Sequence, residues 1–491
     1  MKPDEITTRN VLDVFFRMET AEDLFLHKLS DATPFWDVLR RDVYLTLHTL
    51  HGGPFALPQR LPPPSLAGRA KDLLKPMANW LSRRYLVRKA PNYLFFTLQR
   101  TRRGDDLVDV LSDHLVQLVS TEAAAVELAN DSAINHWRLV TGGETRVPPL
   151  RIATPRFDAE VQEIARFVER LVLKHFGTAF DFRRLVSDAI WCHRETRKYY
   201  EKLFKVVRPK AVVAINIANL SGMLEVAKKL GIPTVELQHG GSSSHTIIWS
   251  YPRSISPSHP GLLAPTAYFT FAEFWNVNTN YPVELFRSIG NDFMFQDTVC
   301  ANGQGLLFVS SYLYRESLLK IAIELSDLHE NRKIFFKLHP HEYSAKASVL
   351  EAVGGRSNLV VVMDEVDFTE LFTFCEYVVG VQSTMLYVAL QARKKVCILK
   401  IANYFWHSDI FDHVALFDTP AELLLITSSI TGNYFQNLDS VPVIFKPFDD
   451  QNFLRALQDV EQAGRHRSST GASNAPREGR CAKALESRAE Q

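Results

Sequence analysis

Hydrophobic and polar positions follow a regular pattern from about residue 208 onward, where short apolar runs are separated by stretches with apolar residues every three to four positions. Short runs rich in β-branched and aromatic residues are typical of buried strands, and the wider spacing is typical of helices. Strands are predicted over Ala211–Asn216, Thr234–Gln238 and Ala267–Ala272, with a helix over Leu220–Leu230 between the first two. This succession predicts a βαβ unit, whose parallel strands bring their carboxyl ends to one edge of the sheet.

The alternation is clearest after residue 303, where it predicts a second doubly wound α/β domain. Two such domains in succession leave a cleft between them, the usual place for a ligand that must be shielded from water. The predicted fold class is therefore α/β, with two Rossmann-type doubly wound domains facing a cleft. Strands of the second domain are expected at Leu306–Ser310, Lys333–Leu338, Leu359–Val362, Tyr377–Val381 and Val396–Lys400, and helices at Tyr314–Leu328, Asp367–Phe374 and Thr384–Gln391.

Shifts in composition divide the chain into five segments. Residues 1–30 are predicted to form a helical lead-in, 31–275 a first Rossmann-like domain on the acceptor side, 276–303 a linker and 304–462 the second domain. The last segment, 463–491, is rich in Ser, Gly, Ala, Arg and Glu and has hardly any large apolar residue. A segment of that composition cannot bury enough apolar surface to fold, so we expect a disordered tail.

Charge and cysteine content narrow the class of protein. Lys and Arg total 56 against 55 acidic residues, so the net charge of +1 gives no reason to expect a polyanionic partner for the whole molecule. The five cysteines are far apart and form no Cys-x-x-Cys pair, which favours a reducing compartment over a disulfide framework. No secretory signal and no apolar run of roughly 18 residues is evident. We therefore expect a cytoplasmic protein.

One stretch is strongly basic. Residues 60–103 hold eleven Lys and Arg against the single acid Asp72, and apolar residues recur at helical spacing within 66–89. An amphipathic basic helix of this kind suits an anionic surface, here the inner face of the cytoplasmic membrane. The alternative is an ordinary helix packed on the core with its arginines in solvent. No nucleic-acid recognition module accompanies the charge, so a nucleic acid is not an expected partner.

A strand of the second domain is predicted to end in His339-Pro340. Proline stops the strand and bends the chain, so that the imidazole faces the crevice at the strand ends. A histidine there can hydrogen-bond or protonate a leaving phosphate. The alternative is that His339 only caps the strand through a backbone contact.

A second strand of the same domain is predicted to run into Ser383-Thr384 at a helix start. Free backbone N–H groups, the positive end of the helix dipole and two hydroxyls converge there and make an anion site. A plain capping serine is the alternative. We expect the two motifs to lie at the ends of neighbouring parallel strands and to face one phosphate group. Lys400, just past the last strand, adds positive charge to this site or is a solvated strand end.

These motifs, together with Gln-His-Gly at 238–240 and Ile-Gly-Asn at 289–291, resemble those of the glycosyltransferases of bacterial capsule and surface polysaccharide synthesis. More remotely, the sequence is similar to the bacterial polysialyltransferases and to the glycerophosphate transferases of teichoic acid synthesis. The resemblance covers roughly 208–400. It implies a GT-B fold and a nucleotide-sugar donor. The residues that it places on the donor phosphate are His339, Pro340, Ser383 and Thr384.

The sequence departs from these families in two respects. Many GT-B enzymes place a glutamate soon after the Ser/Thr helix start to hold the nucleotide ribose, whereas Val388 stands at that position here. The acidic-acidic-glycine motif that supplies the base in polysialyltransferases does not occur in the first half of the chain. The base must therefore be sought elsewhere.

Sugar transfer needs a base for the acceptor hydroxyl and positive groups for the departing phosphate. His239 is the favoured base, because it follows a strand of the first domain and the glycines beside it allow close approach of a substrate. Glu236, earlier in that strand, is expected to point to the same side. His245 is a second candidate base, and Gln238 and Gly240 are candidate acceptor contacts. The alternative is a buried histidine that bonds to the backbone.

The sequence contains no Asp-x-Asp site, P-loop or dinucleotide-binding glycine motif, so we expect no metal and no cofactor. The leading hypothesis is a metal-independent glycosyltransferase. It would move a sugar from a nucleotide-sugar to a growing capsule, lipopolysaccharide or other surface polysaccharide, or to a lipid-linked saccharide. The alternatives are a non-hydrolysing nucleotide-sugar epimerase and a catalytically silent glycan-binding protein at the membrane surface.

Overall fold

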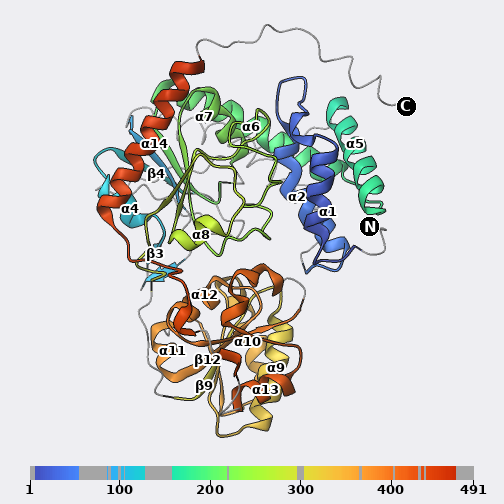
Figure 1. Ribbon diagram of the computed structural model, residues 1–491, viewed down its shortest axis with the longest axis vertical. Helices are drawn as coiled ribbons and strands as arrows, with labels where there is room; N and C mark the ends of the chain where they lie inside the picture. Colours follow the sequence, from blue (N-terminus) through green and yellow to red (C-terminus); the bar gives the residue numbers. More distant parts are fainter. Residues whose placement is uncertain are drawn as a thin grey trace, which may run out of the picture.

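The chain forms two α/β domains, which lie one above the other in Figure 1, with a group of helices beside the first. This computed structural model describes residues 6–54, 86, 90–97, 101–103, 106–127, 158–217, 220–295, 303–363, 368–401, 404–428, 433–435 and 438–471. Each domain is built on a six-stranded sheet in which every neighbouring pair of strands is parallel. The predicted α/β fold class, with two Rossmann-type domains in a GT-B-like arrangement, is confirmed.

The first sheet has the strand order β4-β1-β5-β6-β7-β8. Its strands are β1 (Tyr93–Thr97), β4 (Ala123–Glu127), β5 (Ala211–Ile215), β6 (Thr234–Leu237), β7 (Ala267–Thr270) and β8 (Leu285–Ser288), beside an antiparallel pair, β2 (Thr101–Arg103) and β3 (Asp106–Val108). The helices of this domain are α4 (Asp113–Leu118), α6 (Arg183–Val207), α7 (Ser221–Lys229), α8 (Glu273–Val277) and α14 (Asp450–Gly471).

Both faces of the first sheet are covered, which is why its strands are short apolar runs. Alternate side chains of β5 go to opposite faces. Val212 and Ala214 pack with α6 and α7, whereas Val213 and Ile215 pack with α4 and α14. The last helix of the chain therefore completes the core of the first domain.

The second sheet has the strand order β11-β10-β9-β12-β13-β14, so the order reverses between β9 and β12. Its strands are β9 (Gly305–Val309), β10 (Ile334–Lys337), β11 (Leu359–Val362), β12 (Cys375–Gly380), β13 (Lys395–Leu399) and β14 (Ala415–Phe417). Its helices are α9 (Arg315–Leu328), η4 (Pro340–Ala345), α10 (Lys346–Val353), α11 (Phe368–Phe374), α12 (Thr384–Gln391), η5 (Tyr404–His413), α13 (Pro420–Ser428), η6 (Asn433–Phe435) and η7 (Leu438–Ser440). In such a sheet a ligand binds at the carboxyl ends of the two strands where the order reverses.

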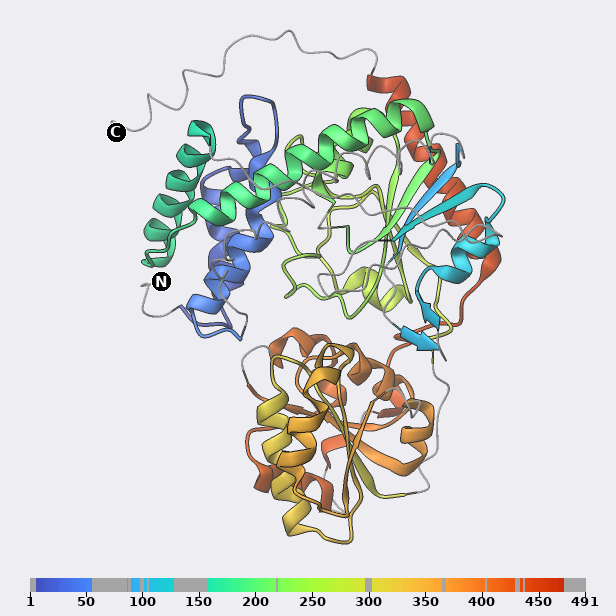
Figure 2. The same ribbon diagram turned by 180° about the vertical axis from the view of Figure 1, so that it is seen from behind.

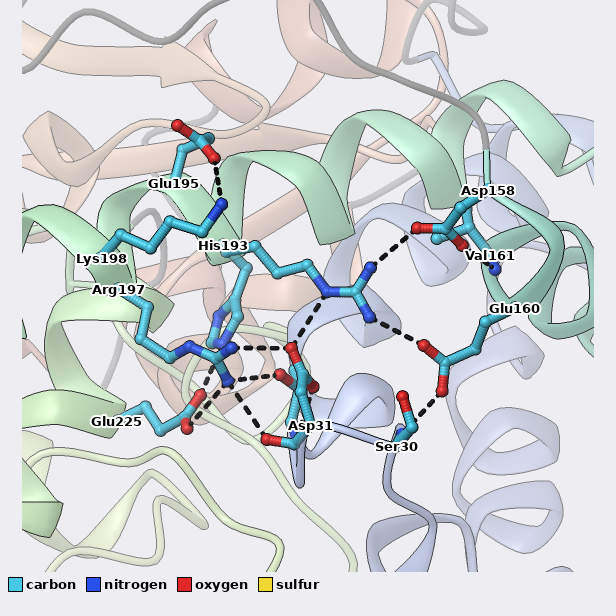
Figure 3. A network of polar contacts seen from close by, with 12 residues as sticks. Ser30, Asp31, Asp158, Glu160, Val161, His193, Glu195, Arg197, Lys198 and Glu225 are labelled. Carbon is cyan, nitrogen blue, oxygen red and sulfur yellow. Dashed lines mark hydrogen bonds and ion pairs between the residues drawn. The ribbon is translucent and has the colours of Figure 1, made fainter.

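The helical group beside the first domain is held by apolar packing and by a polar network. It consists of α1 (Val11–Ala21), η2 (Leu24–Leu26), α2 (Phe35–Leu50), α5 (Ala159–Phe176) and the first part of α6, which continues across the first sheet (Figure 2). Arg197 of α6 binds Asp31 at 2.6 Å (Figure 3). Arg194 of the same helix binds Asp31 at 3.1 Å and Glu160 at 2.8 Å. The network ties the segment before α2 to α5 and α6.

Every strand and helix predicted after residue 208 is present, with its ends shifted by at most two residues. The domain boundaries differ from the prediction. Strand β8 lies inside the predicted linker 276–303, and α14 packs on the first sheet although most of it was assigned to the second domain. Helix α14 also continues into the segment predicted as a tail. Residues 472–491, and the basic segment 66–89 apart from the buried Leu86, lie outside the described residues.

The Ile-Gly-Asn motif at 289–291 lies where the chain leaves the first domain for the second, beside the segment through which it later returns. The N–H of Asn291 donates to the carbonyl of Lys446 at 2.9 Å. Gly290 has a positive φ of 79°, and a Cβ atom there would lie 2.0 Å from the carbonyl oxygen of Pro447. The motif therefore has a structural role, because only glycine lets the two connections between the domains run this close together.

We expect Gly290→Ala to destabilise the protein by at least about 3 kcal/mol, because it adds a backbone clash to the cost of a positive φ. Gly355→Ala is the matched control, since Gly355 also has a positive φ, of 76°, but has nothing within 4 Å of the added Cβ. The control should cost only about 1–2 kcal/mol. Urea denaturation measures both, and equal losses would show that the contact with Pro447 does not matter.

Candidate active site

The predicted phosphate motifs lie on either side of the strand where the order of the second sheet reverses. His339 follows β10 and Ser383 follows β12, and β9 lies between these strands. The expectation that the two strands are neighbours is therefore wrong. Neighbouring strands lie about 4.8 Å apart, so the two strand ends are separated by roughly 10 Å. The gap is filled by the end of β9, where Ser310 and Ser311 are buried.

The His339-Pro340 motif is anchored by an acid that sequence reasoning missed. The side chain of Glu342 is buried, and it accepts hydrogen bonds from the N–H of His339 at 2.8 Å and from the hydroxyl of Ser310 at 3.1 Å. Burial raises the pKa of Glu342, against the opposing effect of these hydrogen bonds. Glu342 thus joins the loop after β10 to the end of β9. Pro340 is exposed and begins η4, as suits its fixed φ.

Ser383 and Thr384 occupy the start of α12, as the sequence predicts, but they make different contacts. The hydroxyl of Ser383 accepts a hydrogen bond from the N–H of Met385 at 3.2 Å and so caps the helix. The hydroxyl of Thr384 accepts a hydrogen bond from the N–H of Gly241 at 2.9 Å. Because Gly241 belongs to the first domain, this contact brings the Gln-His-Gly loop directly onto the predicted phosphate site.

Lys400 and Val388 take no part in the contacts just described. The ammonium group of Lys400 forms an ion pair with Asp418, and the Lys400 N–H donates to the carbonyl of Phe417 at 2.9 Å. Lys400 therefore ties the ends of β13 and β14 together. Val388 is 1% exposed and belongs to the apolar core beneath α12. The position at which the sequence resemblance leads one to expect an acid for the ribose thus faces the core in this chain.

Gln238 builds the loop that reaches the second domain. Its side chain is buried, donates to the carbonyl of Gly240 at 2.9 Å and to the hydroxyl of Ser242 at 3.2 Å, and accepts from the N–H of Phe271 at 2.9 Å. The glycines of the loop allow its backbone to pass close to α12, because a Cβ at Gly240 would lie 3.1 Å from the hydroxyl of Thr384.

Glu236 and His239 both contact Trp249. Glu236 lies in β6 and His239 just beyond its end, so the strand period does not relate the two side chains. The Glu236 carboxylate is fully buried and accepts hydrogen bonds from the hydroxyl of Tyr281 at 2.7 Å and from the indole N–H of Trp249 at 3.4 Å. The half-buried ring of His239 packs against that indole, with 5.2 Å between ring centroids. Glu236 therefore holds Trp249, whose indole in turn packs against His239.

Burial raises the pKa of Glu236 from 4.5 to about 7, against the lowering effect of the hydrogen bonds from Tyr281 and Trp249. Between pH 4.5 and about 7 the Glu236 carboxyl holds a proton in the folded protein that it releases in the unfolded chain. The free energy of unfolding therefore falls as the pH rises through this range. We expect Glu236→Gln to remove this loss. The free energy of unfolding of the variant minus that of the original protein should increase by up to roughly 3 kcal/mol as the pH rises from 4.5 to 8. Urea denaturation at both pH values tests this, and a difference that does not change with pH would contradict it.

His245 lies where the two domains touch. Its ring meets the ring of Phe405 edge-on at 5.8 Å, and burial lowers the pKa of its imidazole. Phe405 belongs to η5 of the second domain. His245 is therefore placed at the contact between the domains, on the same loop as His239.

Sequence reasoning missed a second polar group beside Thr384. Tyr387 lies one turn further along α12, and its hydroxyl donates to Oδ1 of Asp409 at 2.8 Å. Its ring lies 5.1 Å from the ring of His407 and 4.8 Å from that of Trp275 of the first domain. Burial raises the pKa of Asp409 to about 6 and lowers that of His407 to about 4. No local pattern signals this group, because its members come from elements far apart in the sequence.

The described ranges contain no group of three or more His, Cys, Asp or Glu side chains arranged to hold a metal ion. Nor does any helix within them combine the length and the apolar character that crossing a membrane requires.

No protein-family model matches the sequence, and no curated protein matches it either. Among solved structures, the chain is similar to a UDP-GlcNAc 2-epimerase of Methanocaldococcus jannaschii in complex with UDP-GlcNAc and UDP (10% identity, 75% of this chain and 99% of that chain, TM-score 0.43). It is also similar to MnaA of S. aureus with UDP (12% identity, 75% and 96%, TM-score 0.44) and to MurG of Acinetobacter baumannii (12% identity, 77% and 99%, TM-score 0.39).

Proposed function

We propose that this protein is a glycosyltransferase that moves a sugar from a nucleotide-sugar donor to a growing surface polysaccharide. One observation supports the proposal above the others. The helix start at Ser383-Thr384 lies at the strand-order reversal of the second sheet, and the Gln-His-Gly loop of the first domain contacts it at 2.9 Å. A site shared by two domains suits a reaction with two substrates, one on each domain.

In the proposed reaction the donor phosphate binds at the start of α12. The N–H groups of the first turn, the helix dipole and the hydroxyls of Ser383 and Thr384 favour its negative charge. His339 lies across the end of β9 and approaches the phosphate from the other side of the crevice. These groups stabilise the charge that grows on the phosphate as it leaves.

The bond that forms joins the acceptor's hydroxyl oxygen to the anomeric carbon of the sugar. The bond that breaks joins that carbon to the donor's phosphate oxygen, which keeps the electron pair. The hydroxyl proton goes to a base, for which we propose His239, because it begins the loop that contacts Thr384. We further propose that the reaction needs no metal ion. The acceptor that we propose is a polysaccharide or lipid-linked saccharide, held on the side of the first domain at a membrane surface.

A thermal-shift screen tests the donor class. The probes are CMP, CDP, UDP and GDP, each alone and as its sugar, with and without EDTA. We expect at least one pair to raise the melting temperature, with no effect of EDTA and with the shift lost in His339→Ala. Stabilisation that survives His339→Ala would show that the donor site is wrongly placed, and no stabilisation by any probe would overturn the proposal.

Product analysis without any acceptor separates transfer from epimerisation. A glycosyltransferase leaves the sugar unchanged or slowly hydrolyses the donor, whereas an epimerase converts the nucleotide-sugar into its epimer. Recovery of the epimer would assign the protein to the alternative class of nucleotide-sugar enzyme.

A further inference from the structure

A polar group formed by Tyr387, His407 and Asp409 lies outside the proposed phosphate site. Tyr387 lies one turn along α12 from Thr384, and the same glycine of the first domain touches both residues. The N–H of Gly241 bonds to Thr384, and a Cβ at Gly241 would lie 3.1 Å from the ring of Tyr387. The group around Tyr387 is therefore the immediate neighbour of the proposed phosphate site.

Three polar residues in or next to this group lack a full set of hydrogen-bond partners among the described residues. Oε1 of Gln382 and Oδ2 of Asp409 have none, and of the two ring nitrogens of His407 one lies toward the carbonyl of Val381, the residue before Gln382, while the other has none. His407 is only 5% exposed. A buried polar atom without a partner costs about 1–3 kcal/mol, and such atoms persist in native proteins where a ligand, a water or catalysis needs them. Several in one place indicate a site that a polar ligand completes.

The chemistry of these atoms fits a ligand that carries hydroxyl groups. Because burial keeps its pKa far below 7, His407 has one ring nitrogen that donates and one that accepts at neutral pH. The carboxylate of Asp409 and the amide oxygen of Gln382 only accept. A hydroxyl group both donates and accepts, so neighbouring hydroxyls of one molecule satisfy all of these atoms. An anion does not, because Asp409 would repel it.

The surrounding rings favour a sugar among hydroxylated ligands. Trp275 and Tyr387 lie with their ring centroids 4.8 Å apart, and the ring of Phe274 lies 5.0 Å from that of Trp275. A sugar ring presents C–H groups on its faces and hydroxyls at its edge, so it packs on aromatic rings while its hydroxyls bind polar atoms. Gln382 also directly precedes Ser383. A sugar bound here would thus lie next to a phosphate at the start of α12.

We propose that Gln382, His407 and Asp409 form a subsite for the hydroxyl groups of the donor sugar, with Tyr387 positioning Asp409. This inference rests on the proposed function, because it assigns the sugar half of a donor whose phosphate half is held by Ser383 and Thr384. The Gly241 loop covers the subsite, so the sugar enters when the two domains separate at the contact between Gly241 and Thr384.

Titration calorimetry on the full chain tests the subsite. The probes are the nucleoside phosphate and the matching nucleotide-sugar that give the largest shifts in the thermal screen. We expect Asp409→Asn to weaken the nucleotide-sugar roughly 10- to 100-fold and the bare nucleotide by less than about 2-fold. His407→Phe should act in the same direction. Asp412→Asn, on an exposed residue of the same helix η5, is the matched control and should change neither affinity.

The outcomes separate this inference from the proposed function. A loss confined to the nucleotide-sugar supports both. Equal loss of the two ligands, or no loss of either, would overturn the sugar subsite while leaving the donor class intact, and would leave bound water as the partner of these atoms. If no nucleotide or nucleotide-sugar binds the original protein, the proposed function fails and the subsite fails with it. Thermal denaturation of each variant shows whether it is folded.

Discussion

A Ser383→Asp variant is expected to lose nucleotide binding, whereas Ser383→Asn keeps most of it. Both replacements retain a side-chain oxygen that caps α12, so helix stability should be similar. They differ by one negative charge at the proposed phosphate site. Two like charges about 4 Å apart repel by roughly 4 kcal/mol near a protein surface, which corresponds to a loss of more than about 100-fold in affinity.

Calorimetry with the best nucleotide from the screen gives the two affinities, and thermal denaturation checks the cap. Comparing the Asp and Asn variants separates the effect of charge from the effect of the helix cap. Ser383→Ala cannot separate them, because it removes the hydroxyl that caps the helix by accepting from the N–H of Met385. Similar affinities in the Asp and Asn variants would show that no phosphate binds at this helix start, even if the nucleotide binds elsewhere on the protein.

Glu19→Gln is expected to destabilise the protein by about 3–5 kcal/mol, because it leaves a buried cation without its counter-charge. Glu19 and Arg40 are 1% and 2% exposed. The Glu19 carboxylate accepts hydrogen bonds from Arg40 Nε and from the indole N–H of Trp36, each at 2.8 Å. Arg40 also donates to the carbonyl of Ile247 at 2.8 Å, so the pair joins α1 and α2 to the loop that begins at His239.

Urea denaturation at pH 7 measures this loss. Asp181→Asn is the matched control, since it removes the same kind of charge from an ion pair with Arg183 in which both side chains are more than half exposed. Exposed pairs contribute at most about 1 kcal/mol, so the control should hardly change the midpoint. If Glu19→Gln cost no more than Asp181→Asn, the buried pair would not be holding the helical group to this loop.

The fold after residue 208 could be predicted because each strand there is a short apolar run bounded by turn residues, and each helix has a clear period. The two failures have a common cause. Strand β8 contains Arg287, which pairs with Asp459, and α14 is largely polar outside its buried face. Both elements are partly buried only because of the elements that pack against them in the folded protein. Local composition therefore suggested a linker and a tail.

The candidate site was predictable only where it depends on local chain geometry. A proline after an apolar strand and a serine before an apolar helix fix His339 and Ser383 at strand ends in any parallel sheet. Which strands are neighbours depends on topology, so the intervening β9 was not foreseen. Contacts between residues far apart in the sequence could not be predicted from local patterns either. Examples are the ion pair of Lys400 with Asp418 and the hydrogen bond from Tyr387 to Asp409.

The position of α14 also affects the order in which the protein can be completed as the ribosome makes it. Phe453, Leu457 and Val460 close one face of the first sheet, yet they are synthesised after the whole second domain. At the usual rate of translation, the roughly 160 residues between β8 and α14 take on the order of 10–30 s to add. During that time the apolar side chains of β5 and β6 on this face lack the α14 side chains that bury them in the complete protein. The domain that emerges first is thus the last to finish folding.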